Sequence, residues 1–161
     1  MTGRSESAAI EIRRATADDA PAVSTVYLDS FHATYAFPLA HPDEQVREWI
    51  RAEILPAAAT EAWVATDGPG GPIVGIIVVG PDVLDQLYVA PDRLGQGIGR
   101  KLLERAKERS PDGLALFTFQ VNDRARRFYE RNGFVATWFG DGSANEEGQP
   151  DVRYAWRPAR P

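Results

Sequence analysis

Residues 87–103 form a glycine-rich turn between an apolar strand and an amphipathic helix, and read Leu-Tyr-Val-Ala-Pro-Asp-Arg-Leu-Gly-Gln-Gly-Ile-Gly-Arg-Lys-Leu-Leu. Gly95, Gly97 and Gly99 have no Cβ, so the backbone bends freely there and a ligand can approach it closely. The first N–H groups of the following helix have no partner inside that helix, and together with its dipole they attract an anion. The stretch therefore predicts a phosphate-binding site.

Two common phosphate-binding motifs fit this turn poorly. A P-loop places Ser or Thr after its lysine to hold Mg²⁺, but Leu102 follows Lys101 here. A dinucleotide-binding fingerprint reads Gly-x-Gly-x-x-Gly and directly follows the first strand of its unit. The glycines of this chain have the spacing Gly-x-Gly-x-Gly, and they lie beyond its middle. A nucleotide-dependent enzyme is therefore the less favoured alternative.

A second motif follows within residues 114–135. Its pattern is Asn-x-x-Ala-x-x-Phe-Tyr-x-x-x-Gly-Phe, on Asn122, Ala125, Phe128, Tyr129, Gly133 and Phe134. The two motifs, in this order, resemble the GNAT superfamily of N-acetyltransferases. The usual GNAT core Gln/Arg-x-x-Gly-x-Gly aligns on Leu94, Gly97 and Gly99, and Leu94 departs from the family's first position.

The resemblance implies that acetyl-CoA is the cosubstrate and that no metal takes part. It places the pyrophosphate on the glycine turn, and the pantetheine arm along the strand at 87–89. The residues that it assigns to acetyl-CoA are Leu87, Tyr88, Val89, Leu94, Gly95, Gln96, Gly97, Ile98, Gly99, Arg100, Asn122 and Tyr129. A backbone N–H of the same strand would bind the oxyanion of the tetrahedral intermediate.

Two residues are candidates for proton transfer. Tyr129 matches the GNAT tyrosine beside the coenzyme sulfur, where a phenol can supply a proton to the departing thiolate; the alternative is a core aromatic paired with Phe128. Asp85 is the candidate general base, directly or through water, because it shares a strand face with Leu87. Asp85 could instead simply border the strand. Asn122 could contact the ligand, cap the helix that follows it, or do both.

The acceptor site is the least determined part of the sequence. His32 and Tyr35 lie near the first interhelix loop, where GNAT enzymes gather acceptor contacts, and we expect them to contact the acceptor. The acidic residues Glu146, Glu147 and Asp151 could attract a cationic amine, but the simpler interpretation is a solvated hairpin loop. The four tryptophans are expected in the core or at an interface.

Composition narrows the classes of function. The 161-residue chain carries a net charge of −5, which argues against a general nucleic-acid binder. It contains no apolar run long enough to span a membrane and no export signal, so we expect a cytoplasmic protein. The absence of cysteine excludes disulfides, thiolate metal sites and an enzyme thioester. A homodimer stays open.

The pattern of elements predicts an α+β fold. Strands are expected at 10–13, 62–66, 73–79, 83–89, 114–121, 134–139 and 152–156, with helices after Asp19, near Pro42, at the glycine turn and at Asp123. This order, βααβββαβαββ, predicts a mixed, mostly antiparallel sheet of six to seven strands flanked by about four helices, as in the GNAT fold. We expect a single domain over residues 9–157, a disordered N-terminus at 1–8 and a loose C-terminus at 158–161.

These observations predict an N-acetyltransferase that transfers an acetyl group from acetyl-CoA to a primary amine by direct attack. The acceptor is an amine-bearing small molecule or peptide that the sequence does not identify. The alternative is a non-catalytic acyl-CoA-binding or sensor module on the same fold, which would bind the coenzyme without turnover.

Overall fold

The computed structural model describes residues 9–159, and the disorder expected at 1–8 lies outside this range, as do residues 160 and 161. The strands are β1 (Ile10–Arg14), β2 (Glu61–Asp67), β3 (Ile73–Val79), β4 (Leu84–Val89), β5 (Leu114–Phe119), β6 (Val135–Gly140) and β7 (Asp151–Trp156). The helices are α1 (Ala20–Thr34), α2 (Asp43–Trp49), α3 (Ile98–Arg109) and α4 (Asp123–Arg131). The order of strands and α-helices is the predicted βααβββαβαββ.

Short helical turns border several of these helices. A 3₁₀ turn at Ala17–Asp19 precedes α1, and another at Pro91–Arg93 lies between β4 and the glycine turn. The helix expected from Pro42 to Pro56 is divided into α2 and a π-helical segment at Ile50–Ile54. These turns are local variations within the predicted elements.

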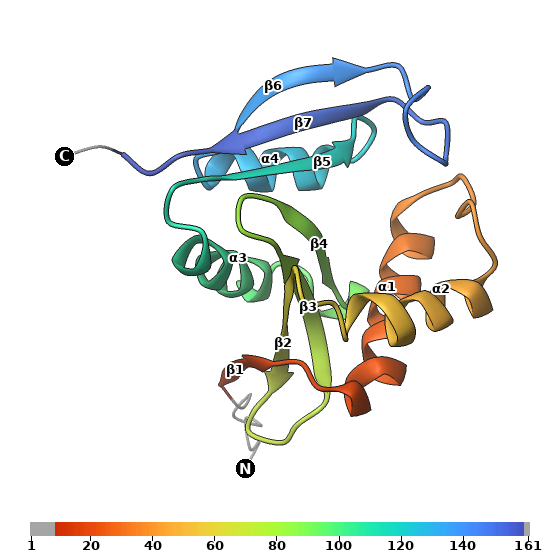
Figure 1. Cartoon of the computed structure of the whole chain (residues 1–161), viewed down its shortest axis with the longest axis vertical. Helices are drawn as coiled ribbons and strands as arrows, with labels where there is room; N and C mark the ends of the chain where they lie inside the picture. Colours follow the sequence, from red (N-terminus) through yellow and green to blue (C-terminus); the bar gives the residue numbers. More distant parts are fainter. Residues whose placement is uncertain (1–8, 160–161) are drawn as a thin grey trace, which may run out of the picture.

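The strands form two antiparallel sheets rather than one continuous sheet. The first has the order β1-β2-β3-β4 and the second the order β5-β7-β6. Only one isolated parallel bridge, between Val83 and Ala115, joins β4 to β5 within the described chain. From that bridge the two strands diverge, so the sheet opens between them (Figure 1).

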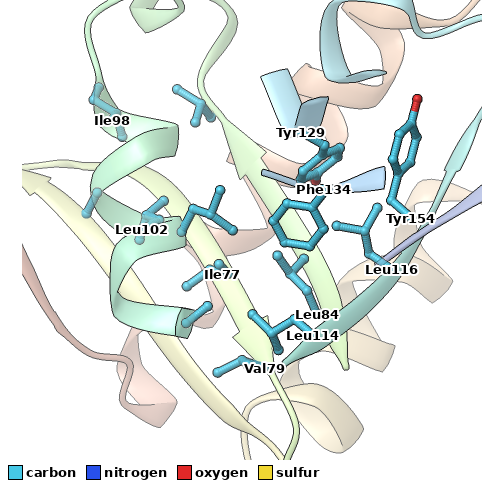
Figure 2. Close-up of a cluster of buried hydrophobic side chains, with 14 of the residues drawn as sticks. Ile77, Val79, Leu84, Ile98, Leu102, Leu114, Leu116, Tyr129, Phe134 and Tyr154 are labelled. Carbon is cyan, nitrogen blue, oxygen red and sulfur yellow. The ribbon is translucent and has the colours of Figure 1, made fainter. Parts of the chain in front are cut away.

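Strand β3 is the centre of the first sheet and is covered on both faces. Ile77 and Val79 pack on the side of α3, whereas Ile76 and Val78 pack on the side of α1 and α2. The run is apolar throughout, as a strand buried on both faces requires. The hydrophobic core on the side of α3 extends to the second sheet, where Tyr129 and Phe134 lie beside Leu84 and Leu116 (Figure 2).

Candidate functional site

The opening between β4 and β5 is a cleft of about 1090 Å³. Its walls come from α1, β4, the glycine turn with the start of α3, β5 and α4, and the loop between β6 and β7. Strand β4 is an edge strand, paired with β3 on one side only. The backbone N–H and C=O groups on its other side therefore face the opening and are free to bind a ligand.

The glycine turn has the backbone that an anion site requires. Gly95 and Gly97 have φ of +77° and +81°, in the left-handed region that favours glycine. Gly97 caps the N-terminus of α3, and apart from Gly97 and its two chain neighbours no heavy atom of residues 9–159 lies within 4 Å of the position that a Cβ would occupy there. The first N–H groups of α3 therefore border an open space at the cleft.

Three arginines surround this turn, and they differ in what holds them. Arg93 is half-buried and donates to Asp67 Oδ2 at 2.8 Å and to Gln96 Oε1 at 3.0 Å, which fastens the turn to the end of β2. Arg100 pairs with Glu104 on the surface of α3. Arg124 of α4 is exposed, and its Nη2 lies 3.6 Å from the Cβ position of Gly95.

Tyr129 lies where the core meets the cleft. Its ring is buried in the main core cluster, 5.3 Å from the ring of Phe128 and 5.5 Å from that of Phe134. The residue also lines the cleft, and its hydroxyl makes no hydrogen bond within residues 9–159. Burial raises the pKa of Tyr129 far above its ordinary value, because the charged phenolate would lose its solvation. The hydroxyl therefore keeps its proton and is available for a hydrogen bond to a ligand in the cleft.

Asn122 connects the two walls of the cleft. Its Oδ1 accepts a hydrogen bond from the backbone N–H of Ala125 at 3.1 Å and thereby caps α4. Its Nδ2 donates to the hydroxyl of Tyr35 at 2.8 Å. Tyr35, which follows α1, also packs between Phe37 and Phe119. This bond ties the end of α1 to the helix that carries Tyr129.

Asp85 lies on the cleft wall, on β4. Desolvation raises the pKa of its carboxyl group, and a hydrogen bond with Gln86 opposes that rise. A raised pKa makes the carboxylate a stronger proton acceptor. This is the environment that a general base needs.

Known proteins with similar sequences show the family of this chain. A family model described as "Acetyltransferase (GNAT) domain" matches residues 58–136. Peptidyl-lysine N-acetyltransferase YjaB of Salmonella typhimurium is 31% identical over 141 residues, which are 88% of this chain and 92% of that protein. The chain belongs to the GNAT acetyltransferase family. It is therefore an N-acetyltransferase.

Solved GNAT structures share the fold. The solution structure of apo-form YjaB from Escherichia coli has a TM-score of 0.76 and 28% identity, and covers 94% of this chain and 99% of its own. The PaiA N-acetyltransferase of Thermoplasma acidophilum, solved in complex with coenzyme A, has a TM-score of 0.70 at 20% identity. That match covers 93% of this chain and 99% of that one, and shows the fold alone.

Most of the site residues expected from the sequence line the cleft of this GNAT acetyltransferase. They are Tyr35, Asp85, Leu87, Tyr88, Val89, Leu94, Gly95, Gly97, Ile98, Gly99, Arg100, Asn122 and Tyr129. The side chain of Gln96 is instead turned to Arg93. His32 is exposed on α1 and lies 3.0 Å from Asp43, bordering a shallower hollow with Asp29 and Asp92. We therefore leave His32 out of the acceptor site.

Several residues that line the cleft were not expected there from the sequence, among them Tyr27, Trp49 and Arg124. The ring centroid of Tyr27 lies 4.4 Å from that of Tyr88, and Trp49, expected in the core or at an interface, packs edge-on to Tyr27. The signal for Arg124 was its position two residues after the capping Asn122, because the start of α4 lies beside the glycine turn.

Within residues 9–159, no helix is both long and apolar enough to cross a membrane. In the same part of the chain, no three His, Asp or Glu side chains gather in a way that could hold a metal ion.

Proposed function

We propose that this GNAT enzyme transfers an acetyl group from acetyl-CoA to a primary amine by direct attack, and that a peptidyl-lysine side chain is its acceptor. One observation carries the proposal: the buried Tyr129, whose hydroxyl makes no hydrogen bond within residues 9–159, lines the same cleft as the open glycine turn and the free edge of β4. The relatives named peptidyl-lysine N-acetyltransferases support the choice of acceptor.

We expect the parts of acetyl-CoA to occupy the cleft in order. The backbone of Gly95, Gly97 and Gly99 and the first turn of α3 would take the pyrophosphate, with Arg100 and Arg124 supplying positive charge. The open space at Gly97 leaves room for the phosphates. The free edge of β4 would take the amide groups of pantetheine, as an added strand takes its hydrogen bonds from an exposed edge.

Asp85 and Tyr129 divide the proton transfers. Asp85, directly or through water, takes a proton from the ammonium group so that the amine nitrogen can attack the thioester carbonyl carbon. A carbon–nitrogen bond forms, and the carbon–sulfur bond breaks as the tetrahedral intermediate collapses. The departing sulfur would take the Tyr129 proton, and the second proton that the attacking nitrogen loses would replace it, so that an amide and free CoA thiol are the products. A backbone N–H of β4 would stabilise the oxyanion, and the Tyr129 hydroxyl would donate to the sulfur as negative charge develops there.

The raised pKa of Tyr129 suits this role. A thiol has an ordinary pKa of about 8.5, below that of a phenol. The hydroxyl therefore keeps its proton while the thioester is bound, and its hydrogen bond strengthens only when the sulfur becomes anionic. Such an interaction stabilises the transition state more than the bound substrate, and so it accelerates the reaction.

Release of free thiol from acetyl-CoA across an acceptor panel tests the acceptor class. The panel contains lysine peptides, the same peptides with an acetylated N-terminus, peptides that offer only an N-terminal amine, and small polyamines. We expect the fastest thiol release with N-acetylated lysine peptides, and a mass increase of one acetyl group on the lysine. Turnover confined to small polyamines or to N-terminal amines would refute the assignment of lysine. Tight binding of acetyl-CoA without turnover would favour the sensor.

A further inference from the structure

The loop between β6 and β7 brings two glutamates to the cleft that the proposed mechanism does not use. Glu146 and Glu147 both line the cleft. Their loop lies on the same side of the molecule as the connection between α1 and α2 (Figure 1). His41 of that connection places its Nε2 3.0 Å from Glu146 Oε2, although 105 residues separate the two. This contact links the loop to the opposite wall and engages Glu146.

Glu147 is the glutamate left without a partner. It is half-buried, and within residues 9–159 its carboxylate makes no hydrogen bond and no ion pair. Two phenols lie near it. Burial is the main cause of the raised pKa of Tyr27 and of Tyr35, and the negative charge of Glu147 raises both further. The carboxylate therefore acts on Tyr27 of α1 and on Tyr35, which follows that helix.

The surroundings of Glu147 suit an alkylammonium group. Tyr27, Trp49 and Tyr88 form a contiguous aromatic group on the cleft wall, with Tyr27 in contact with the other two rings. Aromatic faces beside a carboxylate attract a cation through both the ring quadrupole and the charge. The arginines lie at the glycine turn and on α4. The cleft is thus positive where phosphates are expected and negative at the loop between β6 and β7.

Glu147 lies in the same cleft as the groups that the proposed reaction uses. Tyr35 is bonded to Asn122, which caps the helix that carries Tyr129. Asp85 lines the same cleft, and its charge also raises the pKa of Tyr27. An amine held near Tyr27 and Tyr35 therefore lies in the same cleft as the candidate base and the candidate donor.

Resting on the proposed function, we propose that Glu147 selects the acceptor: its carboxylate binds the protonated primary amine beside Tyr27 and Tyr35 and positions it before Asp85 removes the proton. Glu147 thus determines specificity for cationic amines without taking part in the chemical step. A lysine side chain, which is protonated near neutral pH, fits this requirement.

Steady-state kinetics with a lysine peptide separate this role from a structural one. Glu147→Gln should raise KM for the peptide by about tenfold, the size expected for the loss of one charged hydrogen bond, and leave kcat nearly unchanged. The KM of the wild type should rise with salt more steeply than that of the variant. Glu147→Asp, which keeps the charge, should restore most of the affinity. Glu108→Gln, at the far end of α3, makes the same charge change as a control and should leave KM unchanged.

A binding measurement keeps the assignment of Glu147 apart from the proposed reaction. n-Butylammonium chloride, an analogue of the lysine side chain, is titrated by calorimetry into wild type and Glu147→Gln, each saturated with CoA. We expect weaker binding to the variant and an unchanged CoA affinity, even if no peptide is acetylated. Equal butylammonium binding, or equal peptide KM in an active enzyme, would overturn the role of Glu147 and leave the transferase proposal intact.

Discussion

Neighbouring rings hold the ring of Tyr129 and so fix the position of its hydroxyl. The centroids of Phe128, Phe134 and Tyr154 lie 5.3, 5.5 and 6.2 Å from that of Tyr129. A catalytic donor is more effective when its direction is fixed before the reaction, because no reorganisation is then needed. The packing that holds the Tyr129 ring therefore also orients its hydroxyl for the proposed proton donation.

Replacing Tyr129 by Phe removes one oxygen and keeps the ring packing. We expect kcat to fall about a hundredfold or more, with little change in acetyl-CoA affinity, because the proton is needed only as the thiolate leaves. Single-turnover transfer measures this loss. Tyr154→Phe is the matched control: it removes a hydroxyl from the same core cluster, and its rate should stay close to wild type. Equal rates for Tyr129→Phe and wild type would remove the residue from the mechanism.

Gly97 offers a test of the phosphate site that isolates charge. Asn and Asp have nearly the same shape and both tolerate a left-handed backbone, so Gly97→Asn and Gly97→Asp introduce similar strain. Only the aspartate adds negative charge where the pyrophosphate is expected. Calorimetry should show at least tenfold weaker acetyl-CoA binding for the Asp variant than for the Asn variant, with matching circular dichroism spectra. Identical affinities in the pair would mean that the phosphates bind elsewhere.

At the scale of elements, local patterns predicted β3, α3 and α4 well. The apolar run of β3, the buried stripe of α3 and the cap at Asn122 each depend on residues close in sequence. The division of the sheet depends instead on how far β4 and β5 stay together after the bridge between Val83 and Ala115. No local pattern encodes that distance; only the resemblance, which places the pantetheine arm along residues 87–89, indicated that this edge of the strand is open.

The same distinction applies to the candidate site. The glycine turn and Tyr129 could be found because their motifs are contiguous. The proximity of Arg124 to Gly95, and of Glu147 to Tyr27 and Tyr35, arises from elements far apart in the chain. The orientation of the His32 side chain could not be predicted for a related reason. Consecutive residues on a helix point about 100° apart, so a position near a loop does not place a side chain in the cleft.

The junction of β1 and α1 depends on one buried carboxylate. Asp19 accepts two hydrogen bonds from Arg13, at 2.8 and 2.9 Å, and one from the backbone N–H of Thr16 at 2.7 Å. The Arg13 hydrogen bonds are the main cause of the lowered pKa of Asp19, and burial opposes them.

Asp19→Asn should therefore destabilise the fold by about 1–2 kcal/mol near neutral pH, since Arg13 is partly exposed. A lowered pKa in the folded state stabilises the protein above the unfolded pKa of about 3.9, and this contribution is lost as pH falls through the folded value. Urea unfolding from pH 7 to pH 3 should show the difference from wild type shrinking below about pH 4. Asp18→Asn is the exposed control. A difference that stays constant with pH would contradict the assignment.

At the scale of the whole molecule, acetyl-CoA would connect the two sheets, since its expected contacts come from β4 and α3 on one side and α4 on the other. A ligand that binds only the native state at a hundredfold excess over its Kd stabilises that state by about 2.7 kcal/mol. For a chain of this size we expect acetyl-CoA and CoA to raise Tm by about 5–10 °C. NAD and ATP should do much less. A larger shift with NAD than with acetyl-CoA would defeat the assignment of the cleft.

Direct transfer from acetyl-CoA to the acceptor is the central claim, and a single-turnover experiment with ¹³C-acetyl-CoA tests it most directly. The enzyme is loaded with labelled acetyl-CoA, mixed with a lysine peptide and quenched at successive times for intact-mass analysis of both protein and peptide. We predict that the label appears on the peptide lysine at the rate at which CoA is released, while the mass of the enzyme stays unchanged throughout. A labelled enzyme that rises and decays before the peptide product, or a peptide that stays unlabelled while acetyl-CoA is bound, would contradict it.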